Sequence, residues 1–402
     1  LNSIKHVNVL KRNVFHPHHY EFRCTNLQSN QSFNYSTSYC DSFSFSNVSR
    51  LRTLNVIQMN YIHEKHLIKH QKRNIFTIED PEKQINLGIK YLKGDGVEQN
   101  FEEGARLLKL ASEQGHPLAQ TNLGKCYSDG IGVEQNLEES IRLYQLAAEQ
   151  GYAIAQYNLS GCYFNGYGVE KNIEKGMMYL KLAAKQGHIQ ATTKLAICYL
   201  DGFGIEEDSN KAIDLLKISA NAGDDIAQFI LGNQYYYAMV IEQNFDEAIR
   251  LYKLSAENGN PDSQYTLGYL YSKGRAGEKN EVEAFRLFKL SASTGNVNAQ
   301  YNLAVCYMNG NGTEQNLSEG IRFYQLAADQ GHTEAQYNLG YSYMNGVGVE
   351  QNSEEAVRWY ELAAKQGYIK AKFSLSMCYI SGNGVTQNIQ KGLDKLKFCA
   401  ST

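Results

Sequence analysis

The sequence predicts an all-α fold, an α-solenoid built from nine tandem helix–turn–helix repeats of 36 residues each. Three observations carry this prediction. A leucine recurs every 36 residues from Leu87 to Leu375, a tyrosine follows each leucine by four residues, and a glycine closes each of the eight complete copies. No insertion or deletion interrupts the register over residues 83–402. The repeats start at residues 83, 119, 155, 191, 227, 263, 299, 335 and 371.

The first third of each repeat predicts a helix that ends in a glycine turn. In the eighth repeat, residues 335–370, the apolar side chains of Ala335, Leu339 and Tyr343 recur at the spacing of one helical face. A G-x-G segment beginning at Gly346 follows, and glycine permits the positive φ that breaks a helix. Because the tyrosine at repeat position nine is present in every copy, we assign it to the core.

The remaining two thirds of each repeat predict a second, antiparallel helix. Asn352 is a good N-cap, and Glu355 three residues later predicts a capping-box-like pair with it. Ala356 and Tyr360 are expected to point inward, and Gly367 to end the helix in a left-handed conformation. A hairpin this short buries its apolar faces only by stacking on its neighbours. The equivalent N-caps are Asn100, Asn136, Asn172, Asp208, Asn244, Asn280, Asn316 and Asn388.

Five of the eight cysteines share repeat position eight. Equivalent positions lie about one helix layer, roughly 10 Å, apart, which exceeds the Cα separation of about 7 Å that a disulfide tolerates. We therefore expect reduced, partly buried thiols that act as small apolar side chains. These residues are Cys126, Cys162, Cys198, Cys306 and Cys378.

The consensus A-x-x-x-L-G-x-x-Y-x-x-G-x-G-V-x-x-N-x-x-x-A-x-x-x-Y-x-x-A-A-x-Q-G resembles the Sel-one-like repeat family, a relative of the tetratricopeptide repeat. The resemblance implies a right-handed superhelix that serves as an adaptor in protein assemblies. Two loops depart from the consensus. The fifth repeat has no glycine between Tyr237 and Ile241, and the second glycine of the sixth is shifted to Gly277. Either these loops have drifted, or they bend the array or expose an apolar loop to a partner.

The segment ahead of the array has a different composition. Residues 1–58 are rich in Asn, Ser, Phe and Tyr without periodicity, and we predict that they are largely disordered. Residues 59–82 are interpreted as a possible capping helix and linker, with Asp80 and Pro81 starting the first helix of the array. The sequence begins at Leu1 rather than at methionine, so a targeting signal ahead of it stays open.

The composition argues against several classes of protein. The net charge of -3 gives no basic surface for nucleic acid, and no apolar run reaches the length of a membrane helix. No zinc-type spacing, phosphate loop or catalytic motif is present, so we expect no cofactor, metal or catalytic residue. We expect a cytoplasmic, monomeric protein that binds a protein or peptide.

The predicted partner surface is an aromatic strip at repeat positions three and seven, one turn apart on the first helix, which lines the concave side in related solenoids. An alternative is that position three packs between repeats. Aromatic side chains with polar tips are common in interface hot spots. The strip comprises Tyr265, Tyr269, Tyr301, Tyr337 and Tyr341, and the irregular fifth loop adds Tyr237 and Met239.

These features favour a non-catalytic scaffold or adaptor that binds its partner on the concave face. Two alternatives stay open. One is a regulatory repeat module from a kinase-associated signalling protein. The other is a β-lactamase-like hydrolase, as in a cysteine-rich branch of the family whose repeats carry paired cysteines; here each repeat before the last has at most one.

Overall fold

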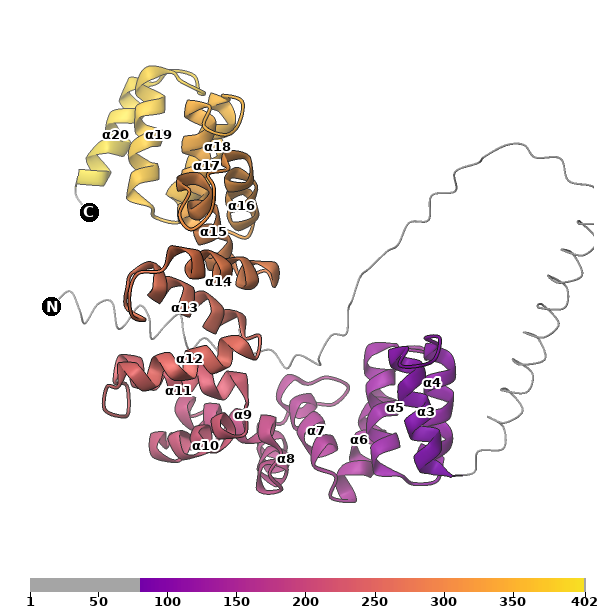
Figure 1. Cartoon of the computed structure of the whole chain (residues 1–402). Helices are drawn as coiled ribbons and strands as arrows, with labels where there is room; N and C mark the ends of the chain where they lie inside the picture. Colours follow the sequence, from indigo (N-terminus) through magenta and orange to yellow (C-terminus); the bar gives the residue numbers. More distant parts are fainter. Residues whose placement is uncertain (1–79, 401–402) are drawn as a thin grey trace, which may run out of the picture. The chain divides into compact units, whose positions relative to one another are not determined.

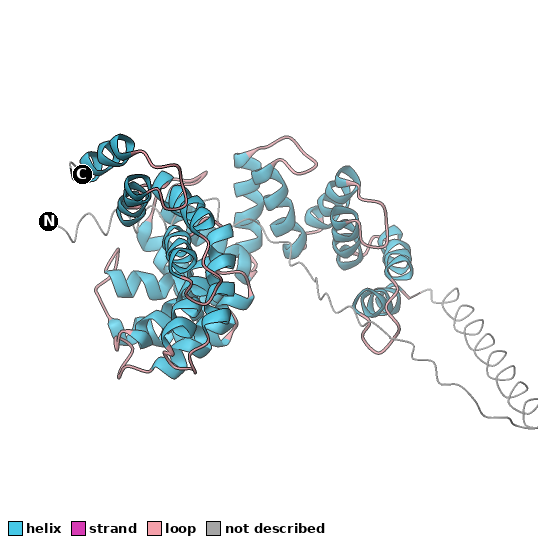
Figure 2. Ribbon diagram, turned by 90° about the horizontal axis from the view of Figure 1, so that it is seen from above, coloured by secondary structure: helices cyan, strands magenta, loops and turns pink. Residues whose placement is uncertain are grey.

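The computed structural model describes residues 80–400, with side chains through residue 396, and over this range it is entirely helical (Figures 1 and 2). The predicted disordered segment, and the capping helix up to residue 79, lie outside the described residues. Eighteen helices form nine antiparallel hairpins. They are α3 (Pro81–Lys93), α4 (Phe101–Glu113), α5 (Pro117–Asp129), α6 (Leu137–Glu149), α7 (Ala153–Asn165), α8 (Ile173–Lys185), α9 (Ile189–Asp201), α10 (Ser209–Asn221), α11 (Asp225–Tyr237), α12 (Phe245–Glu257), α13 (Pro261–Ser272), α14 (Glu281–Ser293), α15 (Val297–Asn309), α16 (Leu317–Asp329), α17 (Thr333–Asn345), α18 (Ser353–Lys365), α19 (Ile369–Ser381) and α20 (Ile389–Ala400).

The helices divide into two compact units. The first contains residues up to 191 together with 201–206, and the second contains residues 192–200 and everything from 207 onward. Within each unit, every hairpin packs against the next one along the chain. The candidate surface described below lies in the second unit.

Each first helix begins two residues before the repeat start that the sequence pattern gave. Pro117, for example, precedes Ala119, and the residue before each helix acts as its N-cap. The side chains of Asp224, Asn260 and His332 accept the N–H of the third helical residue. This cap follows the closing glycine directly, so the turn between repeats contains only a few residues.

The second helices are capped by asparagine as predicted, but the capping box does not form. Asn352 Oδ1 accepts the N–H groups of Glu354 and Glu355. Glu355 does not reach back to the cap; its carboxylate pairs with Arg358 at 3.3 Å. The N–H of Asn352 is instead donated to the carbonyl of Tyr343. Because that backbone bond already satisfies the Asn352 N–H, the Glu355 carboxylate is available to pair with Arg358 one turn along the helix.

The ninth-position tyrosine therefore stabilises the turn of every hairpin through its backbone carbonyl. Its carbonyl accepts the N–H of the next N-cap in all nine hairpins, from Tyr91 to Tyr379. Its ring is less uniform: Tyr163 and Tyr379 are buried, which confirms the core assignment for them. The other seven rings are only half-buried.

The core follows the repeat pattern. The fifth-position leucine is buried in every repeat except the first. Glycine at position six lets the second helix approach closely: a Cβ added to Gly340 would lie 2.8 Å from the Tyr360 ring. Cys126, Cys306 and Cys378 are free buried thiols, as predicted, and burial raises the pKa of Cys126 and of Cys306 to about 11.

The second glycine of the G-x-G turn fixes the contact between neighbouring repeats. A Cβ added to Gly132 would lie 2.0 Å from the carbonyl oxygen of Phe101, and one added to Gly312 would lie 2.0 Å from that of Glu281. In both cases the contacted residue is the first of the preceding repeat's second helix. Only glycine permits this approach, which explains the recurring pair of glycines better than turn geometry alone.

A ladder of buried amides links the repeats. Gln336, in α17, donates its Nε2 to the carbonyl of Ala328 in the preceding repeat at 3.1 Å. Its Oε1 accepts from Gln366 of its own repeat at 2.9 Å. Gln336 therefore joins two repeats through one buried and one part-buried hydrogen bond, and buried bonds are costly to leave unmade. Gln156, Gln228 and Gln264 make the same buried bond to the preceding repeat. The same amide pair occurs at Gln84–Gln114, Gln120–Gln150, Gln156–Gln186 and Gln300–Gln330.

Candidate functional site

The position-three tyrosines of the predicted strip pack between helices rather than standing free. Tyr301 stacks on His332, with ring centroids 4.5 Å apart and planes at 18°. Tyr337 packs against Tyr360 at 5.7 Å and Tyr368 at 5.3 Å. Tyr265 is half-buried in the same way, with its ring 6.1 Å from that of Phe288. Burial raises the pKa of Tyr265 and of Tyr301. These rings mainly join neighbouring elements and offer only an edge to a partner.

The position-seven residues differ sharply along the chain. Gly161, Ile197 and Asn233 are buried. Tyr269 of α13 and Tyr341 of α17, in contrast, are 39% and 51% exposed. Repeat symmetry places both at the same point of a first helix. Exposed aromatic surface at equivalent positions is therefore confined to the later repeats.

The ninth repeat extends this exposed row. Phe373 at position three and Met377 at position seven, both on α19, are 53% and 44% exposed. Neither residue belongs to the predicted aromatic strip, although both occupy the repeat positions that define it. The exposed row is defined here as Tyr269, Tyr341, Phe373 and Met377.

The irregular fifth loop places a second aromatic group at the end of α11. Ala238 adopts φ 50, the one described non-glycine residue with positive φ, where other repeats have glycine. Tyr237 is 40% exposed, and Met239 is half-buried. The Tyr236 ring meets the Tyr237 ring edge-on at 4.9 Å. The missing glycine thus coincides with a pair of tyrosines, of which Tyr236 is half-buried and Tyr237 is exposed.

The sixth loop contacts this pair through Arg275. A hydrogen bond with the Tyr236 hydroxyl raises the pKa of the solvent-exposed Arg275 guanidinium, and the nearby Tyr269 and Tyr237 act in the same direction. Burial, followed by the nearby Tyr236 and Tyr269, raises the pKa of Tyr237. The two irregular loops therefore meet in one tyrosine cluster, defined as Tyr236, Tyr237, Tyr269 and Arg275, which shares Tyr269 with the exposed row.

The exposed row and the tyrosine cluster supply groups that are suited to binding. Within the described part of the chain, no group of three or more His, Cys, Asp or Glu side chains is placed to hold a metal ion. Tyrosine rings with accessible hydroxyls, beside an arginine, supply apolar area, hydrogen bonds and one positive charge. None of the helices between residues 80 and 400 has the length and apolar character needed to cross a membrane.

The hairpin geometry, the repeated caps and the 36-residue period agree with one family model. The model of the Sel1 repeat matches residues 82–116, 117–152, 153–188, 189–224, 225–260, 261–296, 297–332, 333–368 and 369–394. The chain belongs to the Sel1 repeat family. Its matched segments begin at or within one residue of the first helices, in agreement with the structural boundaries. No curated protein matches the chain.

Two solved structures are similar over most of the array. One is a protective antigen present in uropathogenic Escherichia coli strains, which displays an SLR fold. It is 28% identical, with a TM-score of 0.50 and 80% of each chain covered. The other is a Sel1 repeat protein from Oxalobacter formigenes, 27% identical with a TM-score of 0.51, covering 74% of this chain and 86% of that one. Both support the Sel1 repeat assignment.

Proposed function

We propose that this Sel1 repeat array is a non-catalytic scaffold that binds a protein or peptide through the face formed by its first helices in the later repeats. The observation that carries the proposal is the exposed row. Four large side chains are 39% to 53% exposed at two equivalent positions of three first helices. Packing within the array does not use these surfaces, and aromatic side chains at such sites dominate many interfaces.

The tyrosine cluster supports a polar component of the same interface. Arg275 lies beside three tyrosines and is fully exposed. A partner that binds at Tyr269 would contact both the exposed row and the positive charge of Arg275. We expect the contact to combine an apolar anchor with hydrogen bonds to the tyrosine hydroxyls, and we expect a single copy of this chain to be sufficient.

Affinity capture with the full chain tests the proposal. The variant Tyr269→Ala with Tyr341→Ala removes two exposed rings and little core packing, so it should fold normally. Its affinity for the main partner should fall about tenfold or more. The matched control is Tyr167→Ala with Ile218→Ala, at side chains that are 55% and 57% exposed elsewhere in the chain.

Two results would contradict the proposal. The first is equal recovery of every partner by the row variant and the wild type. The second is catalytic turnover, measured as nitrocefin hydrolysis or phosphotransfer by the purified full chain, because either activity requires a catalytic site that a scaffold does not have.

A further inference from the structure

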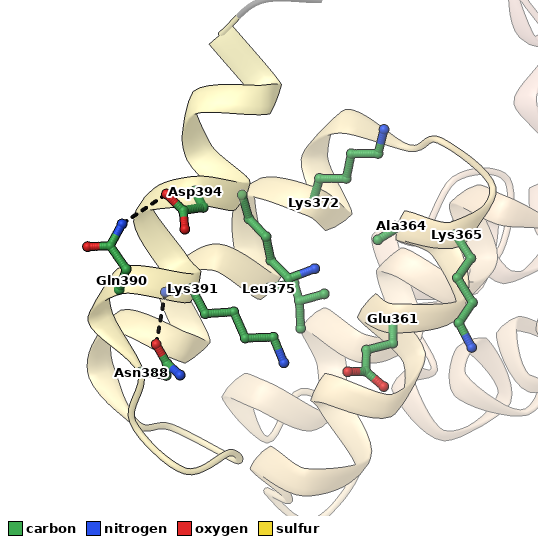
Figure 3. Close-up of a pocket in the computed structure, with 10 residues that line it drawn as sticks. Glu361, Ala364, Lys365, Lys372, Leu375, Asn388, Gln390, Lys391 and Asp394 are labelled. Atoms are coloured by element: carbon green, nitrogen blue, oxygen red, sulfur yellow. Dashed lines mark hydrogen bonds between the residues drawn. The ribbon is translucent and has the colours of Figure 1, made fainter.

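A cavity of about 920 Å³ lies among the last three helices, α18, α19 and α20 (Figure 3). Its apolar lining comes from Ala364 of α18 and Leu375 of α19. Lysines of all three helices surround it, and Figure 3 shows Lys391 extending from α20 toward Glu361 of α18. Its volume lies in the range of ligand-binding pockets, roughly 300 to 1,000 Å³.

The cavity results from changes that are particular to the ninth repeat. Repeat position 25 is Leu, Tyr, Phe or Trp in all eight preceding repeats, from Leu107 to Trp359. Trp359 is 5% exposed and packs against Ala328 and Leu339. Ala364 and Leu375 are the equivalents of those two residues one repeat later, but the residue that faces them is Lys395. A flexible ammonium side chain therefore replaces the large apolar side chain that closes the other grooves.

The cavity carries more positive charge than its carboxylates offset. Lys365, Lys372, Lys391 and Lys395 line it, against Glu361 and Asp394. Asp394 already accepts a hydrogen bond from Gln390 at 3.0 Å, and Glu361 accepts one from the Tyr379 hydroxyl at 3.4 Å.

The ammonium groups of these lysines have hydrogen-bond donors available for a ligand. Among the described residues, Lys365, Lys391 and Lys395 take part in no ion pair within 4.0 Å. Lys391 donates to the Tyr379 hydroxyl at 2.8 Å, which uses one of its three donors. An anionic group entering the cavity would gain unshared ammonium donors without first breaking an ion pair.

We propose that this cavity binds an acidic peptide segment that carries one large apolar side chain. The apolar side chain packs on Leu375 and Ala364, in the place that Trp359 fills one repeat earlier. The peptide carboxylates pair with Lys365, Lys391 and Lys395. Among the lining residues that the structure describes, none provides an aromatic face for a base or an arginine fork for a phosphate, so a peptide fits better than a nucleotide. This site shares no residue with the exposed row and goes beyond the proposed function.

Fluorescence anisotropy with the full chain tests the proposal. The probe is a fluorescein-labelled hexapeptide of five glutamates and one tryptophan. The wild type should bind it, with an affinity that falls as salt rises. Lys395→Leu restores the residue type of the other repeats, so it should raise the melting temperature while weakening probe binding about tenfold or more. Lys391→Glu should weaken binding at least as much. Lys253→Leu and Lys253→Glu, at an exposed lysine of α12, are the matched controls.

Three results would overturn the proposal. One is unchanged probe affinity in Lys395→Leu or Lys391→Glu. Another is equal binding of a probe in which glutamine replaces every glutamate. The third is displacement of the probe by ATP at equimolar concentration, which would identify a small-anion site. The variant Tyr269→Ala with Tyr341→Ala should bind the probe like the wild type, which separates this site from the proposed scaffold surface.

Discussion

Two pairs of repeats differ in the contacts that link their helices. The seventh and eighth repeats follow the regular pattern, whereas the fifth and sixth do not. In the seventh and eighth, both turns contain G-x-G, and the amide pairs Gln300–Gln330 and Gln336–Gln366 form at 2.7 and 2.9 Å. In the fifth, Ala238 and Val240 occupy the two glycine positions. In the sixth, Thr294 donates to its own helix, and the buried Oε1 of Gln264 has no partner. The fifth repeat keeps the amide pair, because Asn258 donates to Gln228 Oε1 at 3.3 Å. The departure that both irregular repeats share is the missing second glycine, at Val240 and Ala276, and it coincides with the tyrosine cluster.

The largest expected effect tests the close contact of the regular turns. Gly312→Val should destabilise the array by about 2 to 5 kcal/mol, from the left-handed conformation and overpacking together. The added Cβ would lie 2.0 Å from the Glu281 carbonyl oxygen at φ 71. Urea unfolding followed by circular dichroism measures the loss.

The control for this variant is Gly331→Ala, at φ 89 with no atom within 4 Å of the added Cβ. It should cost only the backbone strain, about 1 to 2 kcal/mol. Equal losses in both variants would show that the turn conformation, and not the contact between repeats, makes glycine necessary.

The second prediction compares the complete and the incomplete rungs of the ladder. Gln336→Met removes one buried and one part-buried hydrogen bond, whereas Gln264→Met removes one buried bond. At about 1 kcal/mol for each bond, the first variant should lose about twice the free energy of unfolding that the second loses. Similar losses in urea unfolding would mean that the ladder does not distinguish the two regions.

The third prediction concerns the irregular fifth turn. Ala238→Gly relieves a left-handed residue at φ 50 and should stabilise the chain by about 1 kcal/mol. The melting temperature should rise. If it falls, the Ala238 methyl group makes favourable contacts that outweigh the strain, and the loop is better packed than its backbone suggests.

The smallest expected effect is a pH dependence in the eighth repeat. His332 Nδ1 accepts the N–H of Ala335, and burial lowers the histidine pKa, with Glu334 opposing the shift. The unfolded chain, with a histidine pKa of about 6.5, therefore binds the proton first as pH falls. Stability should be complete above that value and should decrease as pH drops toward the lower folded pKa.

His332→Asn gives this repeat the cap of Asn296, which does not titrate. The decrease in melting temperature between about pH 7.5 and pH 5 should become smaller in this variant. An unchanged pH profile would mean that protonated His332 is tolerated between Tyr301 and Glu334.

Features that depend on a few consecutive residues were predictable from the sequence. The period, the asparagine caps and the glycine turns are visible in the sequence because each depends on the backbone conformation of its own residues. Only the structure shows that the second glycine of the turn is also needed for contact with the preceding repeat. The predicted capping box was wrong because it depends on a hydrogen bond outside the local pattern. The N–H of Asn352 is satisfied by the carbonyl of Tyr343, nine residues away, and no local pattern indicates that bond.

Whether a tyrosine is exposed was decided by the tertiary structure. Tyr301 and Tyr341 belong to the same predicted strip, yet the first stacks on His332 and the second is 51% exposed. The sequence determined that a repeat array forms, because its signals are local and recur at a fixed period. Only the packing of one repeat on the next decided which surfaces stay exposed and where a cavity is left. The burial of a side chain depends on residues of the neighbouring repeat, as the equivalent positions Trp359 and Lys395 illustrate.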